Sequence, residues 1–166
     1  MPIKAPNTED LERSRYFLTE WMPPLLRRIA EAHPPAVLAD LGAGDGGTLW
    51  PLDRAGLVGE TIYAVDISAE HVALCERLSL KVKGIVSDVA HVEELPDGSV
   101  DAAISSQVIE HLPDDRVLAP EIARLLRPGG WFYVSSVIRG PHGFWMYRGI
   151  TQLGIGWLME RLYFVV

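Results

Sequence analysis

The stretch "VLADLGAGDGG" (37–47) constrains the fold more than any other part of this chain. An apolar run that ends near Asp40 is followed by four glycines within the six residues 42–47. Glycine has no side chain and adopts positive φ, so such a loop turns tightly and lets a ligand approach its backbone. A helix that follows the loop presents free N–H groups at its start. The stretch therefore predicts a strand, a ligand-binding turn and a helix.

Apolar runs and helical patterns alternate along the rest of the chain. We expect strands at 36–41, 61–66, 81–87, 101–106 and 131–138, and helices near 47–55, 69–79 and 107–126. A helix at 8–33 is expected to precede them, with a break at Pro23–Pro24. This alternation predicts an α/β fold, in which a doubly wound, mostly parallel sheet is covered by helices on both faces. Ligands bind such sheets at the carboxyl ends of the strands.

The glycines by themselves leave the kind of ligand open. Gly42, Gly44 and Gly47 fit the G-x-G-x-x-G pattern of dinucleotide-binding proteins, and Asp66 follows at the end of the second expected strand. These residues alone fit an NAD-binding dehydrogenase module, or a tight turn that binds nothing. Asp40 favours another ligand, because a carboxylate there repels a pyrophosphate and attracts a molecule that carries an ammonium and a sulfonium.

Five motifs follow one another in order over about residues 36–138. They are Asp40 with its glycines, "AVDIS", "VSDVAHVEELP", "DGSVDAAISSQVIEHLPD" and "EIARLLRPGGWFYVSS". With these motifs the chain resembles the class I S-adenosylmethionine-dependent methyltransferases, most closely the small-molecule type that includes the ubiquinone/menaquinone-biosynthesis enzymes. The resemblance implies the Rossmann-like fold of that class, with S-adenosylmethionine as cofactor and S-adenosylhomocysteine as product. It also implies a small-molecule or lipid-like methyl acceptor.

The resemblance assigns the methionine end of the cofactor to the first motif. Gly42, Gly44 and Gly46 would bring the loop backbone against the methionine part, and Asp40 would hold its ammonium directly or through water. Ser105 would close the fourth strand beside the sulfonium. Each assignment has a simpler alternative: Asp40 bonding to the loop N–H groups, and Ser105 serving only as a small residue at a crowded strand end.

The adenosine end is assigned to the second and third motifs. Asp66 would accept hydrogen bonds from both ribose hydroxyls, as a carboxylate can. Ile67 would pack on the adenine face, Asp88 would accept from the adenine amino group, and the Val89 N–H would serve a ring nitrogen. The alternatives are a helix cap for Asp66, a role that Ser68 already fills, and a turn residue for Asp88.

His111 follows the fourth expected strand, where the acceptor would arrive. An imidazole can act there as a general base, since it titrates near neutral pH. The resemblance also implies that relatives share the pair Glu110–His111 whatever their substrate. We therefore favour a structural or cofactor-positioning role for His111 over the role of base.

Composition and charge exclude several other classes. The net charge is −7 and the pI is about 5.2, so the chain has no long-range attraction for nucleic acid. Cys75 is the only cysteine and no two histidines share a helical turn, which argues against a disulfide and a metal site. The sequence has no run of 18 apolar residues and no apolar signal at its charged N-terminus, so we expect no membrane span and a cytoplasmic location.

The two ends of the chain complete the expected organisation. Residues 1–35 are expected to form a helical cap, 36–138 the cofactor-binding core, and 139–166 a substrate-side loop with a shortened C-terminal element. The family continues after its fifth strand with a helix and two strands, for which residues 139–166 are too few. We therefore expect one of three cases: a truncated chain, an abbreviated end, or an apolar end that contacts a partner subunit or a second copy.

A non-catalytic, methyltransferase-like subunit is the remaining alternative function, and the short C-terminal end is its best support. The segment "GPHGFWMYRG" is rich in aromatic residues and glycine, which is typical of a pocket wall or of a surface loop. His142 and Tyr147 are the candidates there for contact with the acceptor.

Overall fold

The structure, a computed structural model, describes residues 22–136. The N-terminal part of the expected helix 8–33 lies outside the described residues, and so do the expected C-terminal elements with His142 and Tyr147. The proposed division of the chain into three regions therefore stays a prediction.

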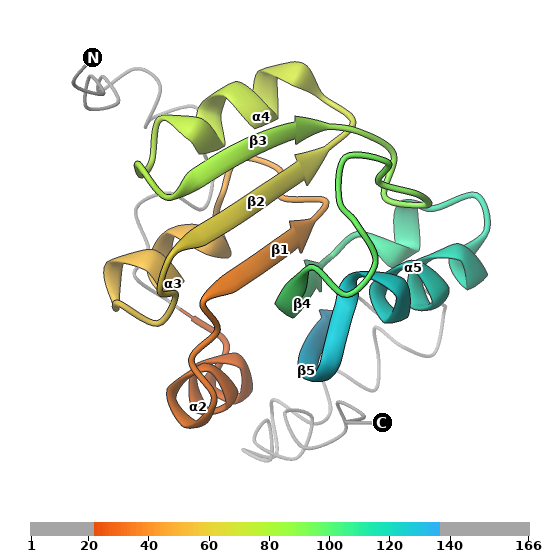
Figure 1. The fold of residues 1–166 in the computed structure, drawn as a ribbon. Coiled ribbons are helices and arrows are strands. Elements are labelled where there is room, and N and C mark those ends of the chain that lie inside the picture. The colour runs from red at the N-terminus through yellow and green to blue at the C-terminus, as the bar shows by residue number, and fades with distance from the viewer. Residues whose placement is uncertain (1–21, 137–166) are drawn as a thin grey trace, which may run out of the picture.

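Five strands form one sheet in the order β3-β2-β1-β4-β5, and every neighbouring pair is parallel. The strands are β1 (Val37–Leu41), β2 (Thr61–Asp66), β3 (Val82–Val86), β4 (Val100–Ser106) and β5 (Leu126–Ser135). In Figure 1 the arrows of β1, β2 and β3 lie side by side and point the same way. The predicted parallel sheet is confirmed, and the first four strands end within one residue of their predicted bounds.

Helices cover both faces of this sheet, as predicted. They are α2 (Pro24–Ala32), α3 (Leu49–Arg54), α4 (Ala69–Glu76) and α5 (Leu118–Leu125). The apolar side chains of α2 and α3, with Cys75 of α4, pack on the face that includes Leu38 of β1. Those of α5 pack on the opposite face, with Ala39 and Leu41. Side chains along β1 thus alternate between two cores, which makes the sheet doubly wound.

The predicted helix over 107–126 is wrong in its first half. Two short 3₁₀ turns, η1 (Ile109–His111) and η2 (Asp115–Val117), precede α5. Leu112 stands before Pro113 and has an extended backbone with ψ 138°, because a residue before proline is kept out of the helical region. The Asp114 carboxylate then accepts a hydrogen bond from Arg116 N at 3.1 Å and starts η2.

β5 begins five residues earlier than predicted. Its pairing with β4 passes from Val100↔Leu126 to Ala102↔Trp131, so residues 127–130 form a bulge opposite Asp101. The expected end of the helix near residue 126 is confirmed, because Leu126 is the C-cap of α5.

A buried carboxylate closes the amino ends of the strands. Asp101 Oδ2 accepts hydrogen bonds from Ala36 N at 2.7 Å and Val37 N at 2.9 Å, and Asp101 Oδ1 pairs with Arg127 at 2.7 Å. Each of its oxygens therefore has a partner. These bonds join β1, β4 and the bulge of β5 at the end of the sheet away from the glycine loop.

At the carboxyl ends, the chain leaves β1 for α3 on one face, and leaves the adjacent β4 toward α5 on the other. This is the switch point at which open α/β sheets bind ligands. In the part of the chain that the structure describes, no helix combines the length and the apolar character needed to cross a membrane.

Candidate functional site

The glycine-rich loop folds back over the end of β2. Gly42 N and Ala43 N both donate hydrogen bonds to Val65 O, at 2.8 and 2.9 Å. Gly42, Gly44 and Gly46 all have positive φ, between 54° and 86°. A Cβ on Gly42 or Gly46 would stand 2.3 Å from a neighbouring side chain, whereas a Cβ on Gly44 would meet nothing within 4 Å. Two of the glycines therefore serve packing, and Gly44 turns its backbone to open space.

Asp40 lies beneath this loop with an unsatisfied carboxylate. The residue is 1% exposed, and its Oδ2 has no hydrogen-bond partner among the described residues. Burial, and then the nearby charge of Asp66, raise the pKa of Asp40 to about 8. A buried polar atom without a partner destabilises a fold, so its presence here points to a ligand that supplies the partner. The simpler role, bonding to loop N–H groups, is not seen for Oδ2.

Asp66 joins the glycine loop to the next helix. Its Oδ2 accepts a hydrogen bond from Gly44 N at 2.8 Å, and its Oδ1 accepts one from Ser68 N at 2.9 Å. His71 Nδ1 lies 3.3 Å from Oδ1. The helix cap expected of Ser68 is confirmed, because Ser68 Oγ accepts from His71 N at 3.3 Å. A carboxylate can accept about four hydrogen bonds, so Asp66 retains capacity for further donors.

Cys75 supports the loop from below. Its buried thiol donates a hydrogen bond to Gly44 O at 3.3 Å, a contact that the sequence did not indicate. Burial and the surrounding carboxylates, beginning with Asp40, raise the pKa of Cys75 well above its ordinary value. The thiol therefore stays protonated, as expected of a packing residue.

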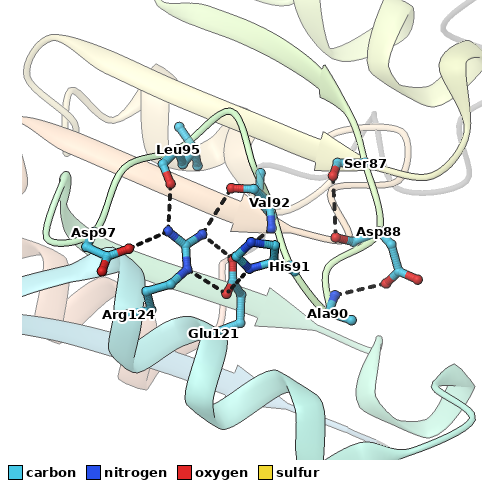
Figure 2. A network of polar contacts seen from close by, with 9 residues as sticks. All are labelled: Ser87, Asp88, Ala90, His91, Val92, Leu95, Asp97, Glu121 and Arg124. Atoms are coloured by element: carbon cyan, nitrogen blue, oxygen red, sulfur yellow. Dashed lines mark hydrogen bonds and ion pairs between the residues drawn. The ribbon is translucent and has the colours of Figure 1, made fainter.

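The segment after β3 lies next to Asp66 at the same edge of the sheet. Asp66 pairs with Val86 in the parallel register, and Ser87 N donates to Asp66 O at 3.1 Å. The exposed Asp88 carboxylate accepts from Ala90 N at 2.9 Å, which forms a turn (Figure 2). The adjacent Val89 is buried.

Ile67 has an unusual exposure for a large aliphatic residue. It follows Asp66 directly, and it is 77% exposed although isoleucine is usually buried. Val86, the register partner of Asp66, is 53% exposed. An apolar surface thus adjoins Asp66 at the position assigned to the adenine face.

Ser105 lies near the end of β4, as predicted, and its place beside the sulfonium stays a prediction. It is buried, and its hydroxyl donates to Leu41 O at 2.9 Å, which ties the end of β4 to the end of β1. Its proton is therefore used within the protein. Gln107 follows with φ +60°, a left-handed conformation that is uncommon outside glycine, and its N–H donates to Ser135 O at 2.8 Å.

His111 ends η1 and is exposed. Its neighbour Glu110 accepts a hydrogen bond from Ser136 Oγ at 2.8 Å. An open pocket of about 470 Å³ is lined by residues 109, 110 and 112–116. None of the candidate cofactor residues lines this pocket, so we base the site on the loop geometry and on Asp40. No group of three or more potential metal ligands lies together within residues 22–136.

Comparison with known proteins identifies the family. A family model described as "Methyltransferase domain" matches residues 39–134, which is more than half of the chain. The chain belongs to this methyltransferase domain family. The class I identification, its Rossmann-like fold and its cofactor, S-adenosylmethionine, are thereby confirmed as properties of the family. These findings do not favour the NAD-binding alternative.

Two curated relatives and one solved structure are similar over most of this chain. An arsenite methyltransferase of Aquipseudomonas alcaligenes is 32% identical, over 79% of this chain and 46% of the relative. A ubiquinone biosynthesis O-methyltransferase of Xanthomonas axonopodis pv. citri is 33% identical, over 74% and 52%. A methyltransferase solved with the Trm112 activator of Haloferax volcanii is 26% identical, with TM-score 0.60, over 76% and 59%. The chain spans about half the length of the two curated relatives.

Proposed function

We propose that this chain binds S-adenosylmethionine at the carboxyl ends of β1, β2 and β3 and transfers its methyl group to a small-molecule or lipid-like acceptor. The observation that carries the proposal is Asp40. Its buried, unpartnered Oδ2 lies beneath the glycine loop, at the place that the first motif assigns to the ammonium of the cofactor. An ammonium would supply both the missing hydrogen bond and the missing countercharge.

The loop leaves open space at Gly44 for the methionine part of the cofactor. Gly44 faces open space, so its backbone can lie against the methionine part of the cofactor. Gly42 and Gly46 keep the loop closely packed on Val108 and Leu78. Ser105 fixes the end of β4 against β1 and would thereby close the site beside the sulfonium.

The adenosine end would lie across β2 and β3. Asp66 has acceptor capacity left for the ribose hydroxyls, and Ile67 offers an exposed apolar surface for the base. Asp88 would accept from the adenine amino group, while the Val89 N–H would donate to a ring nitrogen. A bound adenine would cover the Ile67 side chain and remove its apolar surface from water.

When bound, S-adenosylmethionine supplies a methyl group already activated on a sulfonium. The contribution of this chain is to hold the cofactor and acceptor in line and to exclude water. His111 would act as a base only where the acceptor must lose a proton, and we favour a structural or positioning role for it. One curated relative is named for arsenite and the other for ubiquinone biosynthesis, so the acceptor of this chain follows from neither name.

A second candidate is a methyltransferase-like subunit that works with a partner. The Haloferax volcanii neighbour was solved with an activator protein, which supports this candidate. Contact with a partner or a second copy through the apolar C-terminal tail stays a prediction, and so does a cytoplasmic location. Both candidates share the same cofactor site.

Calorimetric titration with S-adenosylhomocysteine, and separately with NAD, tests the proposal. We expect micromolar binding of S-adenosylhomocysteine alone, and loss of most of that affinity in Asp40→Asn. Binding of NAD alone would overturn the proposal. Binding of neither ligand would reject this chain as a cofactor-binding unit on its own and favour the partner-dependent candidate.

A further inference from the structure

The segment 87–99 connects β3 to β4 and contains no helix or strand. Backbone N–H and C=O groups in such a segment need partners from elsewhere in the protein. Val92 and Leu95 of this segment are almost fully buried in the core that includes α5. The segment is therefore pressed against the protein, and Asp88 and Val89 stand at its beginning.

Glu121 of α5 supplies one set of partners. Its side chain is 3% exposed, and its Oε1 accepts a hydrogen bond from Val92 N at 2.8 Å. His91 Nδ1 lies 3.3 Å from Oε2 of the same carboxylate. Burial alone would raise the pKa of Glu121, but the hydrogen bonds from Arg124, Val92 and His91 outweigh it and lower the pKa. The buried carboxylate is thus kept ionised by its partners.

Arg124, one turn further along α5, supplies the other set (Figure 2). Its guanidinium donates to Leu95 O at 2.8 Å, to Val92 O at 3.0 Å and to Asp97 Oδ1 at 2.8 Å. It also pairs with Glu121 through two bonds, one of them from Nε at 2.8 Å. A planar guanidinium presents five donors in a fixed fork, which a lysine ammonium cannot reproduce.

The pair fixes the backbone of the segment in three places. Val92 is held by both its N–H and its C=O, and Leu95 by its C=O. Val92 lies four residues after Asp88, and the turn between them is closed by Ala90 N to Asp88 Oδ1. The hydrogen bonds that fix the Val92 backbone therefore restrict the position of the Asp88 carboxylate.

We propose that Glu121 and Arg124 are positioning residues that hold the 87–95 backbone so that Asp88 can select an adenine over other bases. This inference rests on the proposed function, since it needs a bound adenosine. It goes beyond the motif, in which "EIARLL" shows only an amphipathic helix with a glutamate and an arginine three residues apart.

A purely structural role is the alternative, and a second pair in the chain separates the two. Asp101 and Arg127 also combine a buried carboxylate, backbone N–H donors and an arginine, but at the amino ends of the strands. Loss of either pair should weaken the fold. Only loss of the Glu121–Arg124 pair should change which base is bound.

The test compares two ligands, S-adenosylhomocysteine and its purine analogue, in which hydrogen replaces the amino group of adenine and the ring nitrogens stay acceptors. We expect the wild-type chain to prefer the adenine ligand by at least about tenfold, as for a hydrogen bond to a charged group. Arg124→Lys and Glu121→Gln should each bring this ratio of dissociation constants close to one, as should Asp88→Ala. Arg127→Lys, the matched control, should keep the wild-type ratio. Urea unfolding of each variant records its stability.

Each outcome bears on the inference separately from the proposed function. A wild-type ratio in both Arg124→Lys and Glu121→Gln would overturn the positioning role. A wild-type ratio near one would overturn it too, and would leave cofactor binding intact. Failure of the wild-type chain to bind either ligand would instead reject the proposed function. If one of the two variants fails to fold, the ratio in the other decides.

Discussion

Each end of the sheet contains a buried aspartate, and the two differ in whether their carboxylate oxygens have hydrogen-bond partners. At the amino ends, the buried carboxylate of Asp101 has two backbone N–H donors and an arginine. At the carboxyl ends, Asp40 is buried more deeply, and one of its oxygens has no partner. Removing a partner from a buried, paired charge destabilises a fold, and a buried polar atom that has no partner also costs stability. The amino end is therefore built for stability, and the carboxyl end retains an unpaired group that a ligand can use.

The largest effect should come from the stabilising end. Asp101→Ala would leave Ala36 N and Val37 N without their acceptor, so we expect the free energy of unfolding to fall by about 2–4 kcal/mol in urea titrations. The dissociation constant for S-adenosylhomocysteine, corrected for folded protein, should not change. The exposed pair Asp114–Arg116 is the control, and Asp114→Ala should cost far less stability. A variant of Asp101 that stayed fully stable would break the comparison.

Asp40 should make the ligand-free protein less stable as the pH rises. Its pKa is about 8 in the fold against an ordinary 3.8, so between these values the folded state holds a proton that the unfolded state has lost. The contribution of Asp40 to stability therefore declines from pH 4 to pH 8, by an amount on the order of a few kcal/mol. Asp40→Asn removes this decline. The unfolding free energy of the variant minus that of the wild-type chain should therefore increase from pH 4 to pH 8. If the unfolding free energies of the two proteins changed in parallel with pH, the raised pKa of Asp40 would be contradicted.

The same proton gives a second readout for Asp40. An ammonium beside the carboxylate favours its charged form, so binding of S-adenosylhomocysteine at pH 7 should release a proton from the wild-type chain. Titrations in two buffers of different ionisation enthalpy measure this release directly. Asp40→Asn should release none at this site.

Two glycines with the same backbone conformation give a smaller and sharper contrast. Gly44 (φ +54°) and Gly56 (φ +68°) both face open space, so alanine at either costs only the strain of a left-handed backbone, about 1 kcal/mol. In Gly44→Ala the new methyl group enters the space proposed for the cofactor, and we expect affinity to fall by at least about tenfold. Gly56→Ala should keep its affinity. Equal affinities in the two variants would move the ligand away from Gly44.

The smallest effect is expected at the exposed apolar residues. Ile67 is 77% exposed and Leu80 is 82% exposed, so alanine at either should change unfolding free energy by no more than about 0.5 kcal/mol. Ile67→Ala should weaken S-adenosylhomocysteine binding by about 1 kcal/mol, because apolar area covered by the base is lost. Leu80, before β3 at the other end of the sheet, should have no effect on binding. A loss of affinity in both variants would point to a general change in the fold.

Much of the architecture followed from the sequence because local rules dominate it. Apolar runs that alternate with helical patterns predict β1 to β4 within one residue, and the break expected at Pro23–Pro24 coincides with the start of α2. The helix predicted over 107–126 failed because an apolar periodicity continues across Pro113, whereas the backbone before a proline cannot remain helical. The bulge of β5 was missed because register is a property of two strands.

Part of the candidate site could likewise be predicted from the sequence, and part could not. The sequence named Asp40, Asp66 and the glycines, since motif spacing fixes which residues reach the ends of the strands. It could not show that the Ser105 hydroxyl donates a hydrogen bond to Leu41 O, or that the Cys75 thiol donates one to Gly44 O. Both bonds join segments that lie far apart in the chain.

The sequence by itself determined the order of the elements, the family and the residue types at the cofactor end, because short-range periodicity and motif spacing encode them. Only the tertiary structure decided which of two buried aspartates is satisfied, and which pair of α5 holds the segment carrying Asp88. The physical reason is that burial and hydrogen-bond partners depend on residues brought together by the sheet, at separations that no local pattern records.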